Sequence, residues 1–421
     1  MARPMNHPSP RSGPEAAGAA GPGHAEKGSI VGLLTLTGAA FLSVTVEMLP
    51  TGLLPAISDS LHVPVSRAGL LVTAYALMVA LLAAPLGAWT ARFPRRPLLV
   101  AALGGYAISA VISALAGNFA VALAARIAGG TMHALFWAIA VGYAVRLVPP
   151  GSTGRAATFV FGGGTIAFVA GVPAGTSLGE LVGWRLAFGL LAGSFVVLAL
   201  ALRWLLPAFP GSAAGTSAGL SRVLRTPGIG TVVAVTVVLC LGFYGFYTYV
   251  ATFLRHAGVP ESAVGPSLLA YGVTNGIGIF LGGVLADRRP RRSMLIAVSG
   301  LTAALGLAAA ASGVVPAVLA LAACGLAFGT MPVFLQAAAL RVAPEAPDAA
   351  SGLTTSAFNV GIGGGALLGA TVLDHAGISA VPAVGAGLAV CGLVIVLFGG
   401  RAAFTGDVRS GRRRGAGAPD N

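Results

Sequence analysis

Three ionisable side chains lie inside long apolar stretches of this sequence, where a charge is least expected. Glu47 is the only acidic residue well inside such a stretch, and Arg126 and His133 share a later one. A charged group at the centre of a bilayer costs about 2.5–3.5 kcal/mol, so it is expected to face the protein interior or a wet cavity and to be functional. Burial favours the neutral form of a carboxyl group. A carboxyl group that exchanges a proton as each side opens to water is what proton coupling requires. Glu47, Arg126 and His133 are therefore the predicted proton-coupling residues.

Glu47 and Arg126 are expected to lie at similar depths in the membrane. Glu47 is about ten residues from the outer end of its stretch and Arg126 about seven, so at 1.5 Å per residue the depths agree within roughly 5 Å. We expect Arg126 to hold the deprotonated form of Glu47; a static ion pair that only fixes helix packing is the alternative. Pro50 lacks an N–H, which leaves the Val46 carbonyl free and bends the helix beside Glu47. His133 is either a proton relay or a neutral packing residue.

The elements that must position these residues are membrane-spanning helices. Only 9% of the 421 residues are charged and 56% are hydrophobic, with a mean hydropathy of +0.89, whereas soluble domains contain about 25% charged residues. Roughly 20 helical residues cross roughly 30 Å of hydrocarbon, and a window of that length selects twelve apolar runs. Their approximate limits are 30–56, 68–90, 98–116, 119–146, 156–179, 186–206, 228–254, 266–286, 293–312, 315–341, 351–373 and 380–400.

The sequence therefore predicts an all-α integral membrane protein. Its twelve transmembrane helices form two pseudo-symmetric six-helix bundles, residues 30–206 and 228–400. A cytoplasmic linker, residues 207–227, joins the bundles and is the only long polar stretch within the apolar region. The tails, residues 1–29 and 401–421, are predicted to be disordered and cytoplasmic.

The basic residues lie almost entirely on one side of these predicted spans. If both termini are cytoplasmic, the outer segments hold only Arg67, Arg185 and Arg255 of the 25 Lys and Arg residues, and Arg126 lies within a span. The positive-inside rule then predicts a multi-pass protein of the cell membrane with both termini in the cytoplasm. The basic residues of the predicted cytoplasmic face account for the net charge of +13, and such a face favours anionic lipid head groups. No nucleic-acid partner is needed to explain the charge. The three cysteines lie far apart in apolar runs, which predicts no metal site.

The two sets of six runs repeat each other. The loop GAWTARFPRR, from Gly87 to Arg96, follows the second run, and GVLADRRPRR, from Gly283 to Arg292, follows the eighth. In the fourth and tenth runs, LAAR at 123–126 and GTM at 130–132 recur as LAAC at 321–324 and GTM at 329–331. Two parallel six-helix halves joined by a flexible loop are typical of a transporter whose site lies at their interface near the bilayer midplane.

At these motifs the chain resembles the major facilitator superfamily over roughly residues 30–400. It is similar in particular to the twelve-span drug:proton antiporter family and to the arabinose-efflux and chloramphenicol-export-like branches. The segment EMLPTGLLP, which begins at Glu47, and the segment Gly183-Trp184-Arg185 resemble the efflux branch specifically. The resemblance implies proton-driven export, and it implies the span-four role of Arg126, which is followed by the expected Gly130.

The resemblance also assigns gating and antiporter motifs. The family loop reads roughly G-x-L-A-D-R-x-G-R-R and gates the inside-closed state. The second copy matches it apart from Pro290, whereas the first copy has Ala91 for the acid and Pro94 for Gly. The implied gating residues are Gly87, Arg92, Arg95, Arg96, Gly283, Asp287, Arg288, Arg291 and Arg292. The implied antiporter motif of span five consists of Gly171, Pro173, Gly175 and Gly179, which also allow close helix packing.

Aromatic and amide side chains within the spans are the candidate substrate contacts. An aromatic-lined cavity suits apolar or cationic compounds, although any single ring has a lipid-facing or interfacial position as its alternative. Amides inside spans bind substrate or link helices. By the repeat, the second half has no counterpart of Glu47 or Arg126, so we expect proton coupling in the first half and substrate shaping more in the second. The candidates are Met48, Tyr75, Trp137, Phe243, Tyr244, Tyr247, Asn275, Gln336 and Asn359.

These observations predict a transporter and not an enzyme. The sequence contains no P-loop or H-E-x-x-H motif, so neither ATP drive nor an intramembrane metalloprotease is supported. Two G-x-S-x-G matches, residues 175–179 and 215–219, lie in the fifth apolar run and in the polar linker. Neither follows a predicted strand, so they do not indicate a serine hydrolase. We predict a monomeric, cofactor-free, proton-driven exporter of small amphipathic compounds such as antibiotics or toxic metabolites. One alternative is an exporter of sugar or nucleoside-like metabolites, with the amides binding hydroxyl groups. The other is a non-transporting membrane sensor or assembly partner.

Overall fold

The computed structural model describes residues 22–90, 92–149, 153–211, 223–285, 289–344, 347–399 and 404. Over these residues the chain is helical and contains no strand. Twelve of the described helical stretches are long and apolar enough to cross a membrane, which confirms the predicted twelve-span, all-α fold. The predicted disordered tails lie largely outside the described residues, although the first helix already begins at Pro22.

The first six spans are formed by residues up to Leu205. Within lipid each backbone N–H and C=O must be satisfied internally, so these apolar segments form helices. The fifth span is interrupted by a π-helical turn, η1 (Ala167–Gly171), just before Pro173. The helices are α1 (Pro22–Leu61), α2 (Val65–Thr90), α3 (Arg95–Ala114), α4 (Phe119–Val145), α5 (Thr153–Ile166), α6 (Val172–Val182) and α7 (Trp184–Leu205).

The second six spans begin at Ile229. Two of them are interrupted: α9 is followed by the short α10, and α13 by α14, where Pro332 lies in the first turn. The helices are α9 (Ile229–Tyr247), α10 (Val250–His256), α11 (Glu261–Leu285), α12 (Pro290–Ala310), α13 (Val314–Gly329), α14 (Met331–Val342), α15 (Pro347–Ala376) and α16 (Ala380–Gly399).

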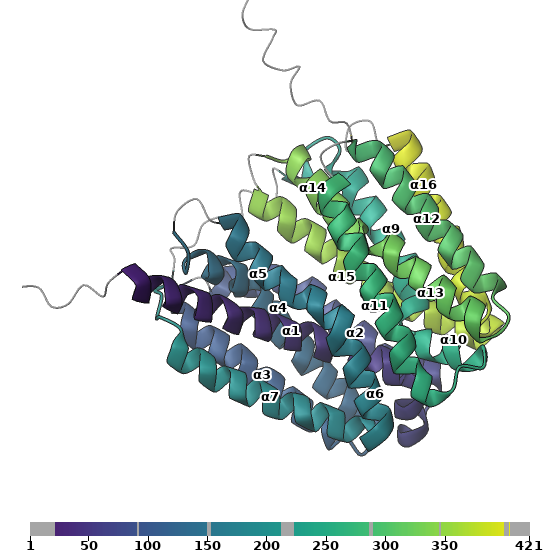
Figure 1. The fold of residues 1–421 in the computed structure, drawn as a ribbon, viewed down its shortest axis with the longest axis horizontal. Coiled ribbons are helices and arrows are strands. Elements are labelled where there is room, and N and C mark those ends of the chain that lie inside the picture. Colours follow the sequence, from purple (N-terminus) through teal and green to yellow (C-terminus); the bar gives the residue numbers. More distant parts are fainter. Residues whose placement is uncertain are drawn as a thin grey trace, which may run out of the picture.

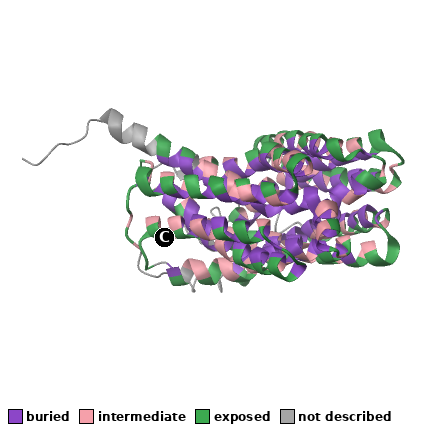
Figure 2. Cartoon of the chain, turned by 90° about the horizontal axis from the view of Figure 1, so that it is seen from below, coloured by how far each residue is buried: buried purple, intermediate pink, exposed green. Residues whose placement is uncertain are grey.

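The two sets of helices lie side by side, the first in purple to teal and the second in green to yellow (Figure 1). Buried positions concentrate along the inward faces of the helices, whereas exposed positions lie on outer faces and at helix ends (Figure 2). Large apolar side chains stand among the exposed ones: Leu181, Trp204, Phe280 and Phe398 are 81%, 79%, 71% and 83% exposed. Apolar surface of this extent is expected where lipid covers the protein.

Arg185 links three helix ends of the first half. Gly183 adopts a left-handed conformation (φ 87°) that turns the chain from α6 into α7, a conformation that glycine adopts without a steric penalty. The guanidinium of Arg185 then lies 4.4 Å from the centre of the Trp184 ring. It donates hydrogen bonds to the Ser60 hydroxyl and, over 2.9 Å, to the Ala116 carbonyl. The Gly183-Trp184-Arg185 segment therefore fixes the ends of α1, α3 and α7 against one another.

The two halves contact each other chiefly through two sets of helices, and α1 also contacts α10. α2 packs against α15, and η1 and α6 pack against α11. Glycines allow both approaches: a Cβ atom on Gly363 would lie 3.2 Å from the Thr73 carbonyl, and one on Gly272 would lie 2.3 Å from the Phe168 carbonyl. These contacts involve the first halves of α2 and α11, which lie on the side predicted to be extracellular. The halves are therefore closed against each other on that side.

Candidate functional site

The charged cluster lies in the first half, where α1, α2 and α4 meet. Glu47 of α1, Arg126 and His133 of α4 are 6%, 3% and 6% exposed, and Tyr75 of α2 is fully buried between them. Two prolines, Pro50 and Pro55, lie inside α1 just after Glu47. The structure thus brings together the three residues predicted to couple protons. It adds Tyr75, which the sequence suggested only as a substrate contact.

Arg126 binds the main chain of two neighbouring helices. Its Nη1 donates to the Val46 carbonyl over 2.8 Å, Nη2 to the Glu47 carbonyl over 2.7 Å and Nε to the Leu71 carbonyl over 3.1 Å. Its guanidinium also stacks over the Tyr75 ring, 4.0 Å from the ring centre, a favourable cation–π arrangement. Arg126 therefore reaches the depth of Glu47 as expected. It holds the backbone of α1 rather than the Glu47 carboxyl group, because Pro50 frees the Val46 carbonyl.

The Glu47 carboxyl group faces His133 instead. His133 Nε2 lies 3.7 Å from Glu47 Oε2, the only acid–base pair within 4.0 Å among the described residues. On the other side of the ring, His133 Nδ1 lies 3.0 Å from the Tyr75 hydroxyl. If that hydroxyl donates to Nδ1, the proton of the neutral imidazole stands on Nε2 and points to Glu47; if it accepts, Nε2 is free to take a proton. The cluster can therefore move a proton between Glu47 and His133.

Aromatic rings enclose this pair within the first half. The rings of Tyr106 and Trp137 lie 6.1 and 6.0 Å from the His133 ring. Tyr106 also stacks on Phe195 of α7, with 4.7 Å between ring centres. Tyr106 was absent from the sequence-based candidates, because a single tyrosine in an apolar run gives no sign of its direction. The His133 ring is therefore surrounded by aromatic side chains of its own half.

A second cluster of aromatic rings lies in the second half. Phe243 and Phe328 stack with 3.8 Å between ring centres, and the Tyr247 and Tyr271 rings lie 5.4 and 6.1 Å from Phe243. Tyr244 packs edge-on to Phe243 at 5.2 Å. The predicted Phe243, Tyr244 and Tyr247 are thus brought together. Tyr271 of α11 and Phe328 of α13 were missed, although Phe328 directly precedes the repeated Gly-Thr-Met segment.

α1 connects the two clusters. Val44 and Met48, on either side of Glu47 in the sequence, belong to the same buried apolar cluster as Phe243, Tyr244 and Phe328. Met48 is therefore buried in an apolar region to which both halves contribute. The helix that carries the acidic side chain thus contributes to the same buried apolar region as the aromatic cluster of the other half.

The three predicted amides have different positions. Asn275 donates to the Tyr271 hydroxyl over 3.4 Å and so joins the aromatic cluster. Gln336 of α14 donates to the Ser351 hydroxyl over 2.6 Å, and Asn359 donates to the Thr355 carbonyl over 3.0 Å. Gln336 and Asn359 thus bind residues of α15. The Asn359 side-chain oxygen is buried without a hydrogen-bond partner in the described part of the chain.

The described gating residues bind neighbouring segments of their own half. Arg96 donates to the Leu206 carbonyl over 3.0 Å, the Arg95 backbone N–H donates to the Phe209 carbonyl over 3.0 Å, and Arg291 donates to the Leu397 carbonyl over 2.8 Å. Arg92 and Arg292 are exposed, Gly87 packs near Ala138, and Gly283 borders open space. Asp287 and Arg288, which the resemblance favoured most, lie outside the described residues.

The glycines of the predicted antiporter motif allow η1 and α6 to pack closely against α1. Cβ atoms added at Gly171, Gly175 and Gly179 would lie 2.1 Å from Thr45, 2.9 Å from Leu49 and 2.6 Å from Leu53, and Pro173 is buried beside them. These partners repeat every four residues along one face of α1, so the two helices touch over two turns. Because η1 and α6 also contact α11, these helices form a continuous packed path from α1 to the boundary between the halves.

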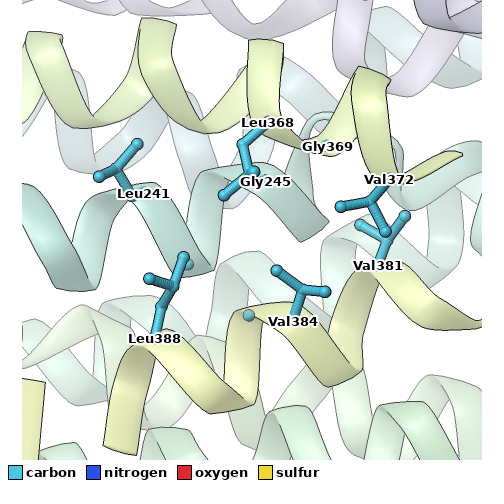
Figure 3. Close-up of a pocket in the computed structure, with 10 residues that line it drawn as sticks. Leu241, Gly245, Leu368, Gly369, Val372, Val381, Val384 and Leu388 are labelled. Atoms are coloured by element: carbon cyan, nitrogen blue, oxygen red, sulfur yellow. The ribbon is translucent and has the colours of Figure 1, made fainter. Parts of the chain in front are cut away.

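The described cavities do not coincide with the charged cluster. One is a small hollow between α9, α15 and α16, lined by glycines and aliphatic side chains such as Leu241, Val372 and Leu388 (Figure 3). It contains no ionisable group and none of the predicted substrate contacts, and its lining is that of a packing gap. A second hollow, lined by Glu180, Arg255 and Glu261 among others, lies where the halves meet on the predicted outer side.

Two packed six-helix halves, with a buried charged cluster in one and an aromatic cluster in the other, define a secondary transporter. The family profile of the Major Facilitator Superfamily matches residues 36–346 and, in a second match, 232–419. The chain belongs to this superfamily, which confirms the resemblance seen in its motifs. It is a multi-pass membrane transporter and not an enzyme.

Individual relatives are efflux proteins. The chain is 37% identical over 355 residues to a protein named chloramphenicol efflux pump of Mycobacterium tuberculosis, covering 82% of this chain and 86% of that protein. It is 32% identical over 364 residues to a probable sugar efflux transporter of Mannheimia succiniciproducens, covering 86% and 92%.

Solved structures show the same fold. A bacterial homolog of the human lysosomal transporter Spinster, in an inward-facing and unoccupied conformation, superposes with a TM-score of 0.67 over 89% of this chain and 95% of that chain. The human organic anion transporter MFSD10 (TETRAN) superposes with a TM-score of 0.65 over 88% and 99%. Both are 18% identical to this chain, so the likeness concerns the fold alone.

Proposed function

We propose that this chain is a proton-coupled exporter of small amphipathic compounds, antibiotics or toxic metabolites among them, that works by alternating access. The observation that carries the proposal is the 3.7 Å contact between Glu47 and His133, buried in one half beside the aromatic cluster of the other. A lone acidic side chain in an apolar span is energetically costly, so it is expected to have a function. Glu47 is the proton-carrying group, and His133 passes the proton to or from it.

One such carboxyl group is sufficient for useful export. A proton that moves inward across 100 mV supplies about 2.3 kcal/mol. At about 1.4 kcal/mol per tenfold, that energy maintains roughly a forty-fold gradient of a neutral solute. Protonation of Glu47 from outside and substrate binding from inside compete for one site, so each excludes the other. Inward movement of a proton is thereby coupled to outward movement of a substrate molecule.

The arrangement of the aromatic cluster favours an aromatic or otherwise apolar substrate. Phe243, Tyr247, Tyr271 and Phe328 stand in near-parallel stacked or tilted arrangements, and aromatic pairs gain about 0.5–1.5 kcal/mol beyond their area burial. A ring of the substrate gains the same when it joins the stack. The 37% identity to a protein named chloramphenicol efflux pump makes chloramphenicol the first compound to test.

Export of a sugar is the second candidate function. It is supported by the relative named as a probable sugar efflux transporter. It is also supported by the side-chain oxygen of Asn359, which is buried without a partner in the described part of the chain and can accept a hydrogen bond from a sugar hydroxyl group. Sugar export predicts no protection against chloramphenicol and a measurable loss of labelled pentose from preloaded cells.

The proposed orientation places both termini in the cytoplasm and the protein in the cell membrane, because nearly all basic residues then lie inside. The closed contacts of α2 with α15 and of α6 with α11 are then on the extracellular side. The transporter acts as a monomer, needs no cofactor and takes its energy from the proton gradient.

Growth of an efflux-deficient host and proton movement in everted membrane vesicles test the proposal. Wild type is expected to raise the inhibitory chloramphenicol concentration several-fold, and chloramphenicol is expected to release protons from energised vesicles. Glu47→Gln is expected to behave like the empty vector in both measurements. Asp59→Asn is the matched control, because Asp59 is an exposed acid at the end of the same helix, and it should behave like wild type. Full proton-driven export by Glu47→Gln would overturn the proposal.

A further inference from the structure

The seventh span breaks where it meets the other half of the protein. α9 ends at Tyr247 and α10 begins at Val250, so Thr248 and Tyr249 lie between two helices. The Tyr249 N–H bonds to the carbonyl of Phe246, three residues back, rather than four residues back as in an α-helix. The Tyr249 side chain is fully buried at this break.

The Tyr249 ring lies between two glycines that belong to different halves. A Cβ atom added to Gly69 of α2 would lie 2.0 Å from the Tyr249 hydroxyl oxygen and 2.6 Å from its Cζ. A Cβ atom added to Gly369 of α15 would lie 2.7 Å from Tyr249 Cε2. Real Cβ atoms do not approach other atoms so closely, so each glycine provides space that this ring occupies.

The hydroxyl group of Tyr249 also meets both halves. It donates to the Ala366 carbonyl of α15 over 2.9 Å and lies 3.5 Å from the Ser66 carbonyl in the first turn of α2. α2 and α15 are the helices that form one of the two main contacts between the halves. Gly69 and Ser66 lie at the end of α2 that is predicted to be extracellular.

We infer that Tyr249 is the latch of the extracellular gate. Its ring and hydroxyl group fill a notch across the α2–α15 boundary and hold the halves together on the outer side. The outward-open state requires α2 to leave this ring. The inference rests on the proposed alternating-access function, since a protein that never opens outward needs no latch. The latch belongs to the transport cycle itself and not to substrate recognition, because neither the Glu47 cluster nor the aromatic stack contacts the Tyr249 hydroxyl in any described hydrogen bond.

The distance between two spin labels on the outer ends of the halves reports this gate. Asp59→Cys at the end of α1 and Ser312→Cys between α12 and α13 place the labels on exposed residues, one in each half. The background replaces Cys240, Cys324 and Cys391 by alanine, and the full chain is reconstituted in lipid without substrate. The measurement needs no knowledge of the exported compound. A failure to export chloramphenicol would count against the proposed function and leave this test unaffected.

Tyr249→Phe removes only the hydroxyl contacts and keeps the packing of the ring. It is expected to increase the open, long-distance population by roughly five-fold, as the loss of one ordinary hydrogen bond predicts. Gly69→Ala inserts a methyl group into the notch and is expected to open the gate further. Gly104→Ala is the matched control, because a Cβ atom there meets nothing within 4 Å, and it should leave the distances unchanged.

The double variant Gly69→Ala with Tyr249→Leu separates a latch from simple helix damage. Leucine lacks the hydroxyl, Cζ and Cε atoms that the new methyl group would meet, so the double variant should open no further than Tyr249→Leu alone. Equal thermal stability of the variants shows that folding is retained. Wild-type distances in Tyr249→Phe, or strictly additive opening in the double variant, would overturn the inference.

Discussion

Arg126 Nη1 donates a 2.8 Å hydrogen bond to the carbonyl oxygen of Val46, the acceptor that Pro50 leaves without its helical donor. A buried guanidinium group must have its N–H groups satisfied, and a buried carbonyl group without a partner is costly in the same way. Pro50 therefore leaves an acceptor that Arg126 needs, and Arg126 supplies the donor that the Val46 carbonyl lacks. As a result the Glu47 carboxyl group faces His133 and forms no ion pair with Arg126.

Pro50→Ala tests this relationship. The new N–H at residue 50 would compete with Arg126 for the Val46 carbonyl and weaken a charge-assisted bond. Such bonds contribute about 1.5–3 kcal/mol, so we expect proton-coupled transport to fall about ten-fold or more. The unfolding temperature should stay the same or rise, because alanine favours a helix interior over proline. Pro55→Ala alters the same helix one turn later and is the control. Equal transport in Pro50→Ala and wild type would contradict the assignment.

His133→Gln should slow proton transfer without removing the proton-binding group. In lightly buffered detergent solution, chloramphenicol is expected to release protons from wild-type protein and none from Glu47→Gln. His133→Gln should release the same amount, more slowly by about ten-fold or more, because a positioned acid–base group accelerates proton transfer. His256, exposed at the end of α10, provides the control His256→Gln. An unchanged rate in His133→Gln would assign this side chain to packing alone.

The sequence predicted the participants of the charged cluster but not all of their contacts. The free carbonyl of Val46 followed from Pro50, and the shared depth of Glu47 and Arg126 followed from counting residues. The choice of His133 as the partner of Glu47 depends on the rotation of α4 about its axis. Hydrophobic periodicity does not report that rotation in a membrane protein, because lipid-facing and core-facing sides are both apolar. The ring contacts that join Phe243 of α9 to Tyr271 of α11 and Phe328 of α13 could not be predicted for the same reason.

Phe328→Ala should lower both the stability of the protein and its affinity for substrate. Loss of a buried ring costs about 3–5 kcal/mol of stability, and Phe246→Ala, at a fully buried ring packed on Phe253, should cost a similar amount. Only Phe328 stacks on Phe243 at 3.8 Å, so only Phe328→Ala should also lower chloramphenicol affinity, by about three- to ten-fold. Binding to purified protein and thermal unfolding separate the two effects. Equal losses of affinity in both variants would remove Phe328 from the site.

The first gating loop anchors the start of the linker between the halves. Arg96 binds the Leu206 carbonyl, the Tyr143 hydroxyl binds the Pro207 carbonyl, and Arg146 binds the Pro210 carbonyl over 2.8 Å. The Phe209 ring packs edge-on to Tyr143 at 5.0 Å. In this first copy Ala91 replaces the acid of the family motif, and the arginines that follow hold the linker instead.

Arg96→Ala and Tyr143→Phe should therefore loosen residues 206–211. Each variant removes one hydrogen bond that contributes about 1 kcal/mol, so amide hydrogen exchange in this peptide should accelerate about five-fold, as local opening becomes easier. Arg92→Ala is the control, because Arg92 is exposed and contacts the Phe93 ring of its own loop. Transport should fall less than in Glu47→Gln, since these hydrogen bonds to residues 206–210 involve none of the proposed proton-coupling residues. Unchanged exchange in both variants would show that the helix ends hold the linker without these side chains.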